Sequence, residues 1–389
     1  MTRDRVLWVS RAVTPSGLRE RVRVVLDGSR ISEVSADVAP AAGDEVFDGA
    51  LLLPGLIDLQ VNGGDGAAYA SSDADERARA THYHLSRGTT SLLATLVTAP
   101  LDELELAIGR LAAEVADANP VLGIHVEGPF LAPAKCGAHA AEHLCDPTPE
   151  TANRLLESAR GTLRMLTLAP ERPGALDAIA QFARAGAVVA AGHSLATYDE
   201  LQAAIGAGLS FVTHVGNASD WPSRPMDHER GYRRSEPGLV GTFLIDQRLS
   251  GSLILDGHHI HPDLARALIA ARGPASIALV SDATPAAGRP PGRYRLGSLE
   301  AEVREGGYAV APGGGLAGSV ITLLDAVRIA VDRAGIPLVD AVTMASEVPA
   351  HLIGHGQRKG VLRAGADADL LLLDDEWRVL RVIRAGAAV

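Results

Sequence analysis

The sequence predicts a (β/α)8 TIM-like barrel with a small β-sandwich domain formed from both chain termini. Eight short apolar runs recur through the middle of the chain, and amphipathic helical stretches separate most of them. Polar residues stand at the carboxyl ends of many runs, where a barrel builds its active site. Short β-rich segments at both ends of the chain complete the pattern. Together these observations indicate an α/β protein with two structural units.

Both ends of the chain carry short β-rich segments divided by turn residues. They occupy residues 6–9, 22–26, 31–34, 44–47, 369–374 and 377–383. Neither end has enough strands to bury an independent core. We therefore expect the two ends to pair into one small domain, made from residues 1–53 and 356–389.

The barrel is expected to span residues 54–355. Its predicted strands cover residues 55–61, 89–98, 121–127, 163–168, 187–191, 209–214, 252–256 and 277–282. Its predicted helices include residues 101–118, 149–160, 198–207 and 321–333. The strands are continuous apolar runs, as expected when both faces are buried. A doubly wound sheet is the alternative, and the polar residues at so many strand ends favour the barrel.

Composition excludes several classes of protein. The 389 residues are 47% hydrophobic and 21% charged, which excludes an intrinsically disordered chain. The net charge is −11, from 36 Lys and Arg against 47 Asp and Glu, so we expect no nucleic-acid partner and no membrane partner. Two cysteines, no signal-peptide core and no apolar stretch of about 20 residues predict a cytoplasmic enzyme.

Four predicted strands deliver side chains that bind metal ions or move protons. Glu127 ends the third run, His193 and His214 come at the ends of the fifth and sixth, and Asp282 ends the eighth. A single histidine at a strand end is more often a hydrogen-bonded structural residue. Strand ends of a closed barrel converge, however, and carboxylate and imidazole ligands that leave one position open are typical of a catalytic metal site. We therefore predict that Glu127, His193 and His214 bind a metal.

Seven ordered motifs give a resemblance to a known family. They are PGLIDLQVNGG, GIHVEGPFL, AGHSLAT, THVGNA, DGHHIHP, LVSDATPAAG and LAGSVITLLDAVR, and they run from about Pro54 to Arg328. In this order they resemble the N-acetylglucosamine-6-phosphate deacetylases of the amidohydrolase superfamily. The resemblance implies a divalent metal, usually a homodimer, and hydrolysis of the acetamide of N-acetyl-D-glucosamine 6-phosphate to D-glucosamine 6-phosphate and acetate.

The resemblance also implies a role for individual positions. Glu127, His193 and His214 resemble the family's metal ligands, and Asp282 resembles its catalytic acid and base. His139 resembles a residue that helps to polarise the substrate carbonyl. The positions that resemble substrate contacts are Ala138, Asn217, Ala218, His259, Leu316, Ala317 and Gly318. Among these, His259 resembles a phosphate-contacting histidine, and residues 316–318 resemble a loop that closes over the acetyl group.

Gln60 and Asn62 stand where many amidohydrolases carry His-x-His and bind two metals. Amide side chains are neutral, weak ligands compared with imidazole. We therefore expect one divalent metal ion rather than two. Zinc suits a Glu-His-His donor set, and Fe²⁺, Mn²⁺, Co²⁺ or Ni²⁺ also bind such ligands.

One segment departs from the family. After THVGNA the family continues into a short loop ending in Arg-Glu-Pro-Gly, whose arginine reaches the substrate phosphate across a dimer interface. Here residues 217–238 are longer, with Ser235 inserted before Glu-Pro-Gly. Arg234 is the closest match to the phosphate-binding arginine and Arg233 the next, while Arg224 and Arg230 offer the same paired hydrogen bonds. A solvated loop without a ligand is the alternative.

The altered loop leaves other functions open. One alternative substrate is a different acetamido sugar, unphosphorylated or nucleotide-linked, and another is an N-acyl amino acid. A barrel that has lost catalysis and serves as a scaffold is the non-enzyme alternative, although the intact Glu, His, His and Asp set argues against it. His258 and His261 are expected either to support other site residues or to face solvent. His82 and His84 are expected on a helix surface.

Overall fold

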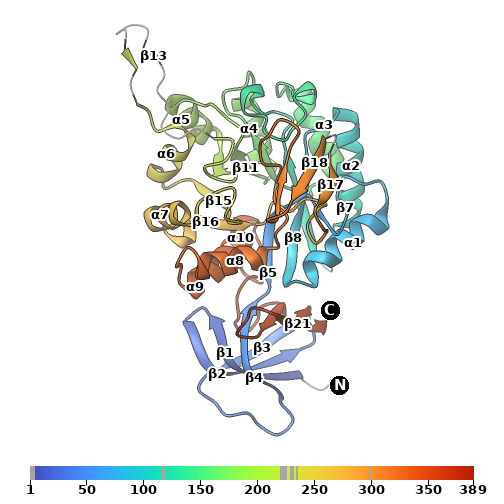
Figure 1. Cartoon of the computed structure of the whole chain (residues 1–389), viewed down its shortest axis with the longest axis vertical. Coiled ribbons are helices and arrows are strands. Elements are labelled where there is room, and N and C mark those ends of the chain that lie inside the picture. The colour runs from blue at the N-terminus through green and yellow to red at the C-terminus, as the bar shows by residue number, and fades with distance from the viewer. Residues whose placement is uncertain (1–4, 116–118, 220–225, 228–231, 234, 298) are drawn as a thin grey trace.

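The computed structural model describes residues 5–115, 119–219, 226–227, 232–233, 235–297 and 299–389. The molecule has two parts (Figure 1). An eight-stranded parallel sheet covered by helices forms the larger part, and a seven-stranded sheet that contains both ends of the chain forms the smaller part. The predicted fold class, a (β/α)8 barrel with a β-domain built from both termini, is confirmed.

Eight parallel strands form the barrel wall. In order around the wall they are β5 (Leu56–Val61), β8 (Thr89–Val97), β9 (Val121–Glu127), β10 (Leu163–Leu168), β11 (Val188–Ala191), β12 (Leu209–Val212), β15 (Ser250–Ile254) and β16 (Ile277–Val280). Every neighbouring pair is parallel. The strand order follows the chain without the reversal of a doubly wound sheet, so that alternative is wrong.

Hydrogen bonds between β5 and the residues that directly follow β16 close the barrel. The backbone N–H of Asp282 donates to the carbonyl oxygen of Gln60 at 2.9 Å. Lower in this seam, the buried carboxylate of Asp58 accepts the backbone N–H of Ser281 at 3.2 Å. The first and last strands are thus joined, and the residues that follow them in the chain come to lie together at the rim.

Helices cover the outside of the wall. They are α1 (Ala74–Leu85), α2 (Leu101–Glu114), α3 (Pro149–Ala159), α4 (Ala175–Arg184), α5 (Tyr198–Ala207), α6 (Gly238–Ile245), α7 (Pro262–Arg272), α8 (Leu323–Asp332), α9 (Leu338–Ala345) and α10 (Glu347–Leu352). Helix α5 starts at a capping box of Thr197 and Glu200 and ends at Gly208, whose φ is 119°. Among the described residues, none of these helices combines the length and the apolar character of a membrane span.

The barrel interior changes from apolar to polar along the strands. Ile57 and Met165, which lie early in their strands, belong to a buried apolar cluster. His125 and Thr167 lie later in theirs, and His125 Nε2 is 2.8 Å from Thr167 Oγ1. This buried polar pair separates the apolar base from the rim.

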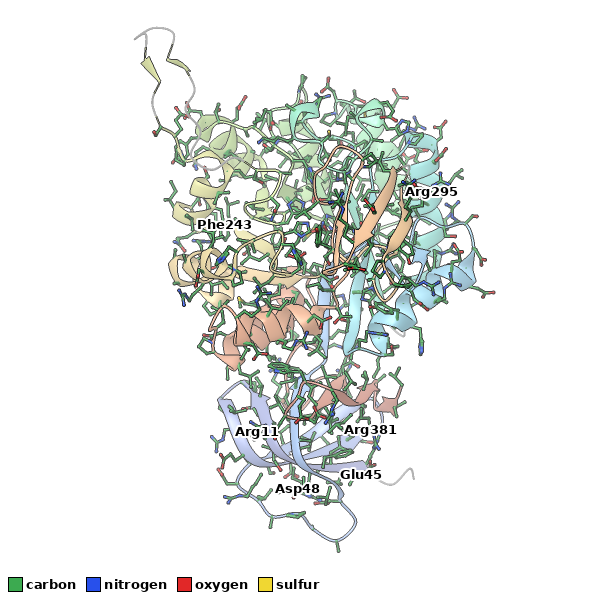
Figure 2. The ribbon with its side chains drawn as sticks, viewed as in Figure 1. Arg11, Glu45, Asp48, Phe243, Arg295 and Arg381 are labelled. Atoms are coloured by element: carbon green, nitrogen blue, oxygen red, sulfur yellow. The ribbon has the colours of Figure 1, made fainter. Side chains whose placement is uncertain are left out.

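The smaller part is a sheet with the strand order β22-β21-β20-β4-β1-β2-β3. Its strands are β1 (Arg5–Thr14), β2 (Gly17–Asp27), β3 (Arg30–Ser35), β4 (Glu45–Pro54), β20 (Leu370–Leu373), β21 (Val379–Arg384) and β22 (Ala387–Ala388). The N-terminal and C-terminal segments meet where β4 pairs antiparallel with β20. Glu45 joins them as well, because its carboxylate accepts hydrogen bonds from Arg5 and Arg381, each at 2.6 Å. Glu45 and Arg381 are labelled in the smaller part of the molecule in Figure 2.

A short connection joins the two parts, and a buried ion cluster lies in the segment between α10 and β20. Gly55 alone separates β4 from β5. Lys359 is 6% exposed, and its Nζ lies 2.6 Å from Asp369 and 3.1 Å from Asp367. Each buried charge thus has a partner, as burial requires. The cluster lies just before β20, where the chain returns to the smaller sheet.

Three small antiparallel sheets lie outside the predicted pattern. They are β6 (Gly63–Gly64) with β7 (Ala67–Ala68), β13 (Met226–Asp227) with β14 (Tyr232–Arg233), and β17 (Gly292–Leu296) with β18 (Leu299–Arg304) and β19 (Tyr308–Val310). The three-stranded sheet is inserted between β16 and α8, and Leu296 at the end of β17 reaches the cavity described below.

Candidate active site

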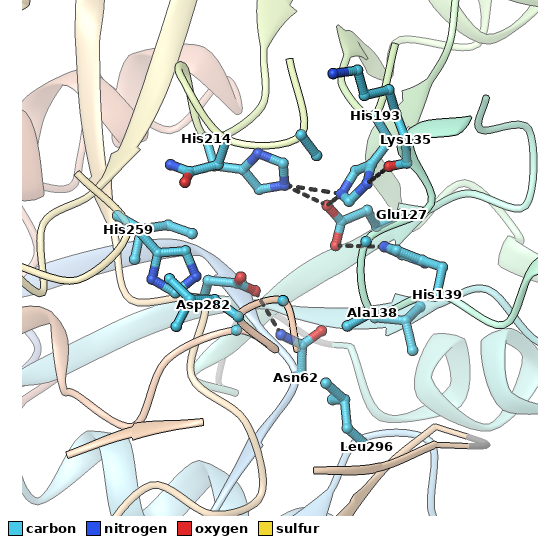
Figure 3. Close-up of a pocket in the computed structure, with 18 of the residues that line it drawn as sticks. Asn62, Glu127, Lys135, Ala138, His139, His193, His214, His259, Asp282 and Leu296 are labelled. Carbon is cyan, nitrogen blue, oxygen red and sulfur yellow. Dashed lines mark hydrogen bonds and ion pairs between the residues drawn. The ribbon is translucent and has the colours of Figure 1, made fainter. Parts of the chain in front are cut away.

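A cavity of about 380 Å³ opens at the carboxyl ends of the barrel strands (Figure 3). Most of the site residues predicted from the sequence line it. They are Asn62, Glu127, Ala138, His139, His193, His214, Asn217, Ala218, His259, Asp282, Leu316 and Gly318. Segments that are far apart in the chain therefore deliver these residues to one place.

Glu127 lies at the centre of this group. It is the last residue of β9 and is 3% exposed. Its Oε1 lies 2.9 Å from His214 Nε2 and 3.3 Å from His193 Nε2. Burial favours the neutral carboxyl, but hydrogen bonds from the two histidines outweigh it and hold the pKa of Glu127 well below its usual range. Glu127 is therefore an anion, as a metal-binding carboxylate must be.

His193 is fixed with Nε2 directed at Glu127. Its Nδ1–H donates to the carbonyl oxygen of Lys135 at 2.8 Å, which orients the ring so that Nε2, once it has lost its proton, can bind a metal ion. Gly192 precedes it at a place where a Cβ would lie 2.8 Å from Thr167 Cγ2 and 3.1 Å from Thr213 Cβ. Glycine therefore allows the chain to pass close to both neighbouring strands and to carry the imidazole over the rim.

His214 completes a triangle of ligand atoms. Its Nε2 lies 3.2 Å from His193 Nε2, so the three separations are 2.9, 3.2 and 3.3 Å. A tetrahedral ion with bonds of about 2.0–2.1 Å places its ligand atoms about 3.3 Å apart. Burial disfavours a charged imidazole, yet the hydrogen bond to Glu127 raises the pKa of His214. Positive charge is thus favoured among these atoms, and the set fits one divalent cation.

His139 forms a second candidate group with Glu127 and His193, whose ligand atoms lie within 4.8 Å of one another. The backbone N–H of Thr98 donates to His139 Nδ1 at 3.3 Å, so the neutral ring carries its proton on Nε2. Burial, followed by the charge of His193, lowers the pKa of His139 to about 3 and keeps the ring neutral. His139 Nε2 is therefore a hydrogen-bond donor, which suits a polarising role better than metal ligation.

Asp282 faces Glu127, His193 and His214 across the cavity (Figure 3). Its Oδ1 accepts hydrogen bonds from Asn62 Nδ2 at 2.7 Å and from Gln60 Nε2 at 3.1 Å. Gly318 packs against it so closely that a Cβ would lie 2.9 Å from the carbonyl oxygen of Asp282. Burial, followed by the negative charge of Glu127, raises the pKa of Asp282 to about 7. A carboxyl near that value can both accept and return a proton.

Unusual backbone conformations mark four predicted site residues. His193, His214, Ala218 and Asp282 have φ angles of 51°, 31°, 46° and 49°, in the left-handed region that few residues other than glycine adopt. Such conformations persist only where the surrounding structure imposes them, and they gather at functional sites. Here they occur in the turns that follow β11, β12 and β16.

The predicted substrate contacts do not all reach the cavity. Ala317 is 1% exposed and packs in the apolar cluster of the β17–β19 sheet, while its neighbours Leu316 and Gly318 line the cavity. Asn217 lines it too, and its buried Nδ2 has no hydrogen-bond partner among the described residues. A carbonyl or hydroxyl oxygen of a bound ligand would supply the missing acceptor.

The three histidines after β15 lie in different surroundings. His259 lines the cavity, and its side chain is 7% exposed. His258 packs its ring against Tyr308 of the β17–β19 sheet, with 4.8 Å between ring centroids. His261 has an exposed side chain and caps the start of α7. Of the three, His259 alone lines the cavity in the described part of the chain.

Cationic residues around the cavity were only partly predicted. Arg233 is described as backbone in β14, whereas its side chain and the whole of Arg224, Arg230 and Arg234 lie outside the described residues. Lys135 lines the cavity and was missed. The sequence contains a signal for this residue, because Lys135 is one of two lysines in the chain and lies four residues before His139.

The barrel, the converging ligand atoms at its rim and the facing carboxyl define a metal-dependent barrel enzyme. The family follows from comparison with known proteins. The chain belongs to the amidohydrolase family, whose model matches residues 51–389.

Individual relatives are deacetylases of amino-sugar phosphates. The chain is 35% identical over 338 residues to N-acetylgalactosamine-6-phosphate deacetylase of Escherichia coli O157:H7, with 86% of each chain covered. It is 31% identical over 382 residues to N-acetylglucosamine-6-phosphate deacetylase of Lysinibacillus sphaericus, covering 96% of this chain and 95% of the relative. A mutant of the Mycobacterium smegmatis N-acetyl-D-glucosamine-6-phosphate deacetylase, solved with N-acetyl-D-glucosamine-6-phosphate, matches with a TM-score of 0.91, 37% identity and 99% coverage of both chains. The expected resemblance to these deacetylases is confirmed.

Proposed function

We propose that this protein hydrolyses the acetamide of N-acetyl-D-glucosamine 6-phosphate to D-glucosamine 6-phosphate and acetate. The observation that carries the proposal is the convergence of Glu127, His193 and His214 within 3.3 Å of one another, with Asp282 opposite them. Amide hydrolysis requires an activated water and a stabilised oxyanion, and this arrangement has groups for both. Similarity to deacetylases of N-acetylated hexosamine phosphates over nearly the whole chain supports the substrate class.

Glu127, His193 and His214 are the proposed metal ligands, and zinc is the metal that suits them best. When bound, a divalent cation polarises the amide carbonyl and lowers the pKa of a coordinated water. Gln60 and Asn62 act as hydrogen-bond donors to Glu127 and Asp282 in this proposal, which leaves no reason for them to bind a second ion.

Asp282 carries the proton in the proposed reaction. It accepts a proton from water as the new carbon–oxygen bond forms, and it returns that proton to the sugar nitrogen as the carbon–nitrogen bond breaks. Its raised pKa, about 7, suits both steps at neutral pH. His139 donates from Nε2 to the carbonyl oxygen as negative charge develops there.

The substrate phosphate requires a cation near the mouth of the cavity. Lys135 is one candidate, because it lines the cavity and its side chain ends in an amino group that can bind an anion. Arg234 and Arg233 of the 217–238 loop are the others, and an arginine supplied by a second chain would make a homodimer necessary for phosphate binding. A cytoplasmic location is part of the proposal, and the two free cysteines agree with it.

The test is release of acetate by metal-loaded protein. We expect kcat/KM for N-acetyl-D-glucosamine 6-phosphate to exceed that for N-acetyl-D-glucosamine and for its nucleotide-linked form by about a hundredfold or more, because only the first presents a terminal phosphate to the cations. Glu127→Ala is the inactive control. Equal rates on the phosphorylated and plain sugars would contradict the proposed substrate, and no release from any of them would contradict the activity.

The 4-epimer, N-acetyl-D-galactosamine 6-phosphate, is the second candidate substrate. Relatives named for that activity in Escherichia coli O157:H7 and a Shewanella strain are 35% identical to this chain. The two sugars differ only in the orientation of one hydroxyl, so the metal, Asp282 and the phosphate cations would act on both alike. Assaying both epimers side by side separates the candidates through their ratio of kcat/KM.

A further inference from the structure

A second cavity, of about 550 Å³, lies next to the active-site cavity. Helix α2, the loop after β7 and strand β17 contribute to its lining. Val97, the last residue of β8, lines both cavities. Leu296 lines the active-site cavity, while its neighbours Arg295 and Gly297 line the second one. Val97 and Leu296 therefore form a partition between the two cavities that is one side chain thick.

This partition is closely packed. A Cβ at Gly297 would lie 3.0 Å from Val97 Cγ2, so the chain that leaves β17 passes directly against the valine. Leu296 is 8% exposed and belongs to a buried apolar cluster, against which Ala138 packs. Packing of this kind does not admit an added methylene without displacing a side chain. The partition therefore separates the two cavities for an alkyl chain.

The partition lies beside the groups that are proposed to act on the substrate carbonyl. Val97 pairs with Glu127 in the barrel sheet. Thr98, the next residue, holds the ring of His139, because its Oγ1 lies 2.9 Å from His139 Nδ1 and its backbone N–H donates to the same nitrogen at 3.3 Å. One proposed metal ligand and the proposed polarising residue are thus direct neighbours of the partition.

The methyl group of the proposed substrate is expected to face the partition. An amide carbon directs its three bonds apart in one plane. The oxygen is assigned to the metal and His139, and the nitrogen must face Asp282, which leaves the third direction for the methyl group. In Figure 3 Ala138 and Leu296 lie on one side of the site and His259 on the other. The apolar side suits the methyl group, and the polar side suits the sugar.

The second cavity has the character of a chamber for an alkyl chain. Its buried lining residues are all apolar in the described part of the chain, and they are Leu96, Leu104, Ala107 and Pro285. Charged residues line it as well, and two of them, Glu103 and Arg295, are exposed. Its buried part therefore favours an apolar group, because a buried polar group without a partner is unfavourable there.

We propose, on the basis of the function proposed above, that Val97 and Leu296 are specificity-determining residues that limit the substrate to a short N-acyl group. The acetyl methyl contacts the partition, and a longer chain is excluded by it. When the partition is opened, the alkyl tail of a longer N-acyl group enters the second cavity. The reaction keeps its balance: water adds oxygen to the acyl carbon, the carbon–nitrogen bond breaks, the amine takes the proton and a longer carboxylic acid leaves in place of acetate.

The first test compares the N-acetyl, N-propanoyl and N-hexanoyl forms of D-glucosamine 6-phosphate by release of the free amine. In the wild type, one added methylene is expected to lower kcat/KM about tenfold or more. Val97→Ala is expected to raise the propanoyl-to-acetyl ratio of kcat/KM about tenfold or more and to bring hydrolysis of the hexanoyl form into the measurable range. Leu296→Ala should act in the same direction. Misfolding cannot produce such a gain.

The outcomes separate this proposal from the proposed function. Equal wild-type kcat/KM on the acetyl and hexanoyl forms would overturn the proposal, as would an unchanged propanoyl-to-acetyl ratio in both Val97→Ala and Leu296→Ala. A wild-type enzyme that releases no amine from any of the three would instead overturn the proposed function.

The second test asks where the longer tail lies. Ala99, two residues after Val97, lines the second cavity. In the double variant Val97→Ala/Ala99→Leu, a larger side chain fills space in that cavity while the partition stays open. Hydrolysis of the hexanoyl form is expected to fall back to the wild-type level, and hydrolysis of the acetyl form should remain as in Val97→Ala. A hexanoyl activity that persists in the double variant would place the tail elsewhere and overturn the proposal.

The chain offers two matched controls. Leu106 lines the second cavity and is 64% exposed, so Leu106→Ala enlarges that cavity without opening the partition. Ile254 lines the active-site cavity from β15, which is not a neighbour of β8 in the barrel, so Ile254→Val enlarges that cavity away from the partition. Both variants are expected to keep the wild-type propanoyl-to-acetyl ratio. A rise in either control as large as that in Val97→Ala would overturn the proposal, because cavity size alone would then set the acyl preference.

Discussion

Asn62 donates a hydrogen bond of 2.7 Å from its Nδ2 to Oδ1 of Asp282, the shortest contact that the Asp282 carboxylate makes among the described residues. Gln60 donates to the same oxygen and also to Glu127 Oε2. The neutral amide of Gln60 thus bridges the carboxylates of Glu127 and Asp282, and the amide of Asn62 holds Asp282 alone. At these positions the side chains orient other groups, and that use competes with binding an ion.

We therefore expect one divalent ion per chain. Elemental analysis of protein freed of loosely bound metal should give a stoichiometry near one. Replacing both amides with imidazoles, in Gln60→His/Asn62→His, supplies the ligands that a second ion lacks and should raise the stoichiometry above one. A wild-type value near two would show that the amides do not prevent a second site.

Metal content also decides between the two ligand groups that share Glu127 and His193. If His214 is the third ligand, His214→Asn should lose most of its bound metal, whereas His139→Asn should keep it. His139→Asn should still lower kcat by about 10² to 10³, because it removes a donor to the developing oxyanion. The opposite pattern, with metal lost from His139→Asn and kept in His214→Asn, would reassign the ligands.

Asp282→Asn tests the proton carrier. The variant keeps the shape of the side chain but cannot accept a proton, so we expect kcat to fall by about 10² to 10⁴ with KM within a few-fold of the wild type. Metal content should be unchanged, because Asp282 is not a proposed ligand. Ser281→Ala, in the preceding residue, serves as a control for local disturbance and should keep most of the activity. Near-normal turnover in Asp282→Asn would remove Asp282 from the mechanism.

The sequence predicts the barrel wall well because eight buried parallel strands leave a clear pattern of short apolar runs. It predicts the strand ends less well, and the reason bears on function. The run ending at Asp282 extends past the last residue of β16, Val280, and the run ending at His214 extends past Val212 of β12. In both places a left-handed turn follows the strand and carries the site residue. The pattern of apolar residues in the sequence gives no indication of such a turn.

Other parts of the site depend on contacts that no local pattern contains. Leu296 reaches the cavity from an inserted antiparallel sheet. Lys135 reaches it from the short 3-10 helix Pro133–Lys135, and its own backbone carbonyl also holds His193. The sequence shows that Asp256 precedes His259 by three residues. Only the folded loop shows that Oδ1 of Asp256 binds the backbone N–H of His258 while Oδ2 lies against the ring of His259.

His84 shows a different failure of sequence reasoning. A histidine on a polar helix was expected at the surface, but His84 is 0% exposed and its Nε2 lies 2.9 Å from the carbonyl oxygen of Gly63. The amphipathic pattern of α1 is weak, so the buried face was not apparent from the sequence. His82, two residues earlier, is exposed as expected.

Burial of His84 predicts a specific loss of stability in acid. Burial lowers the pKa of His84 to about 4 from its ordinary value of 6.5, so the unfolded chain binds a proton here before the folded chain does. Its contribution is complete above pH 6.5 and is lost as the pH falls toward 4, by about 2 to 3 kcal/mol. His84→Gln keeps an N–H for Gly63 but does not titrate, so its free energy of unfolding, measured with urea, should fall less between pH 7 and pH 4.5 than that of the wild type. His82→Gln is the exposed control and should follow the wild type. Parallel curves for His84→Gln and the wild type would mean that His84 is not the group that titrates.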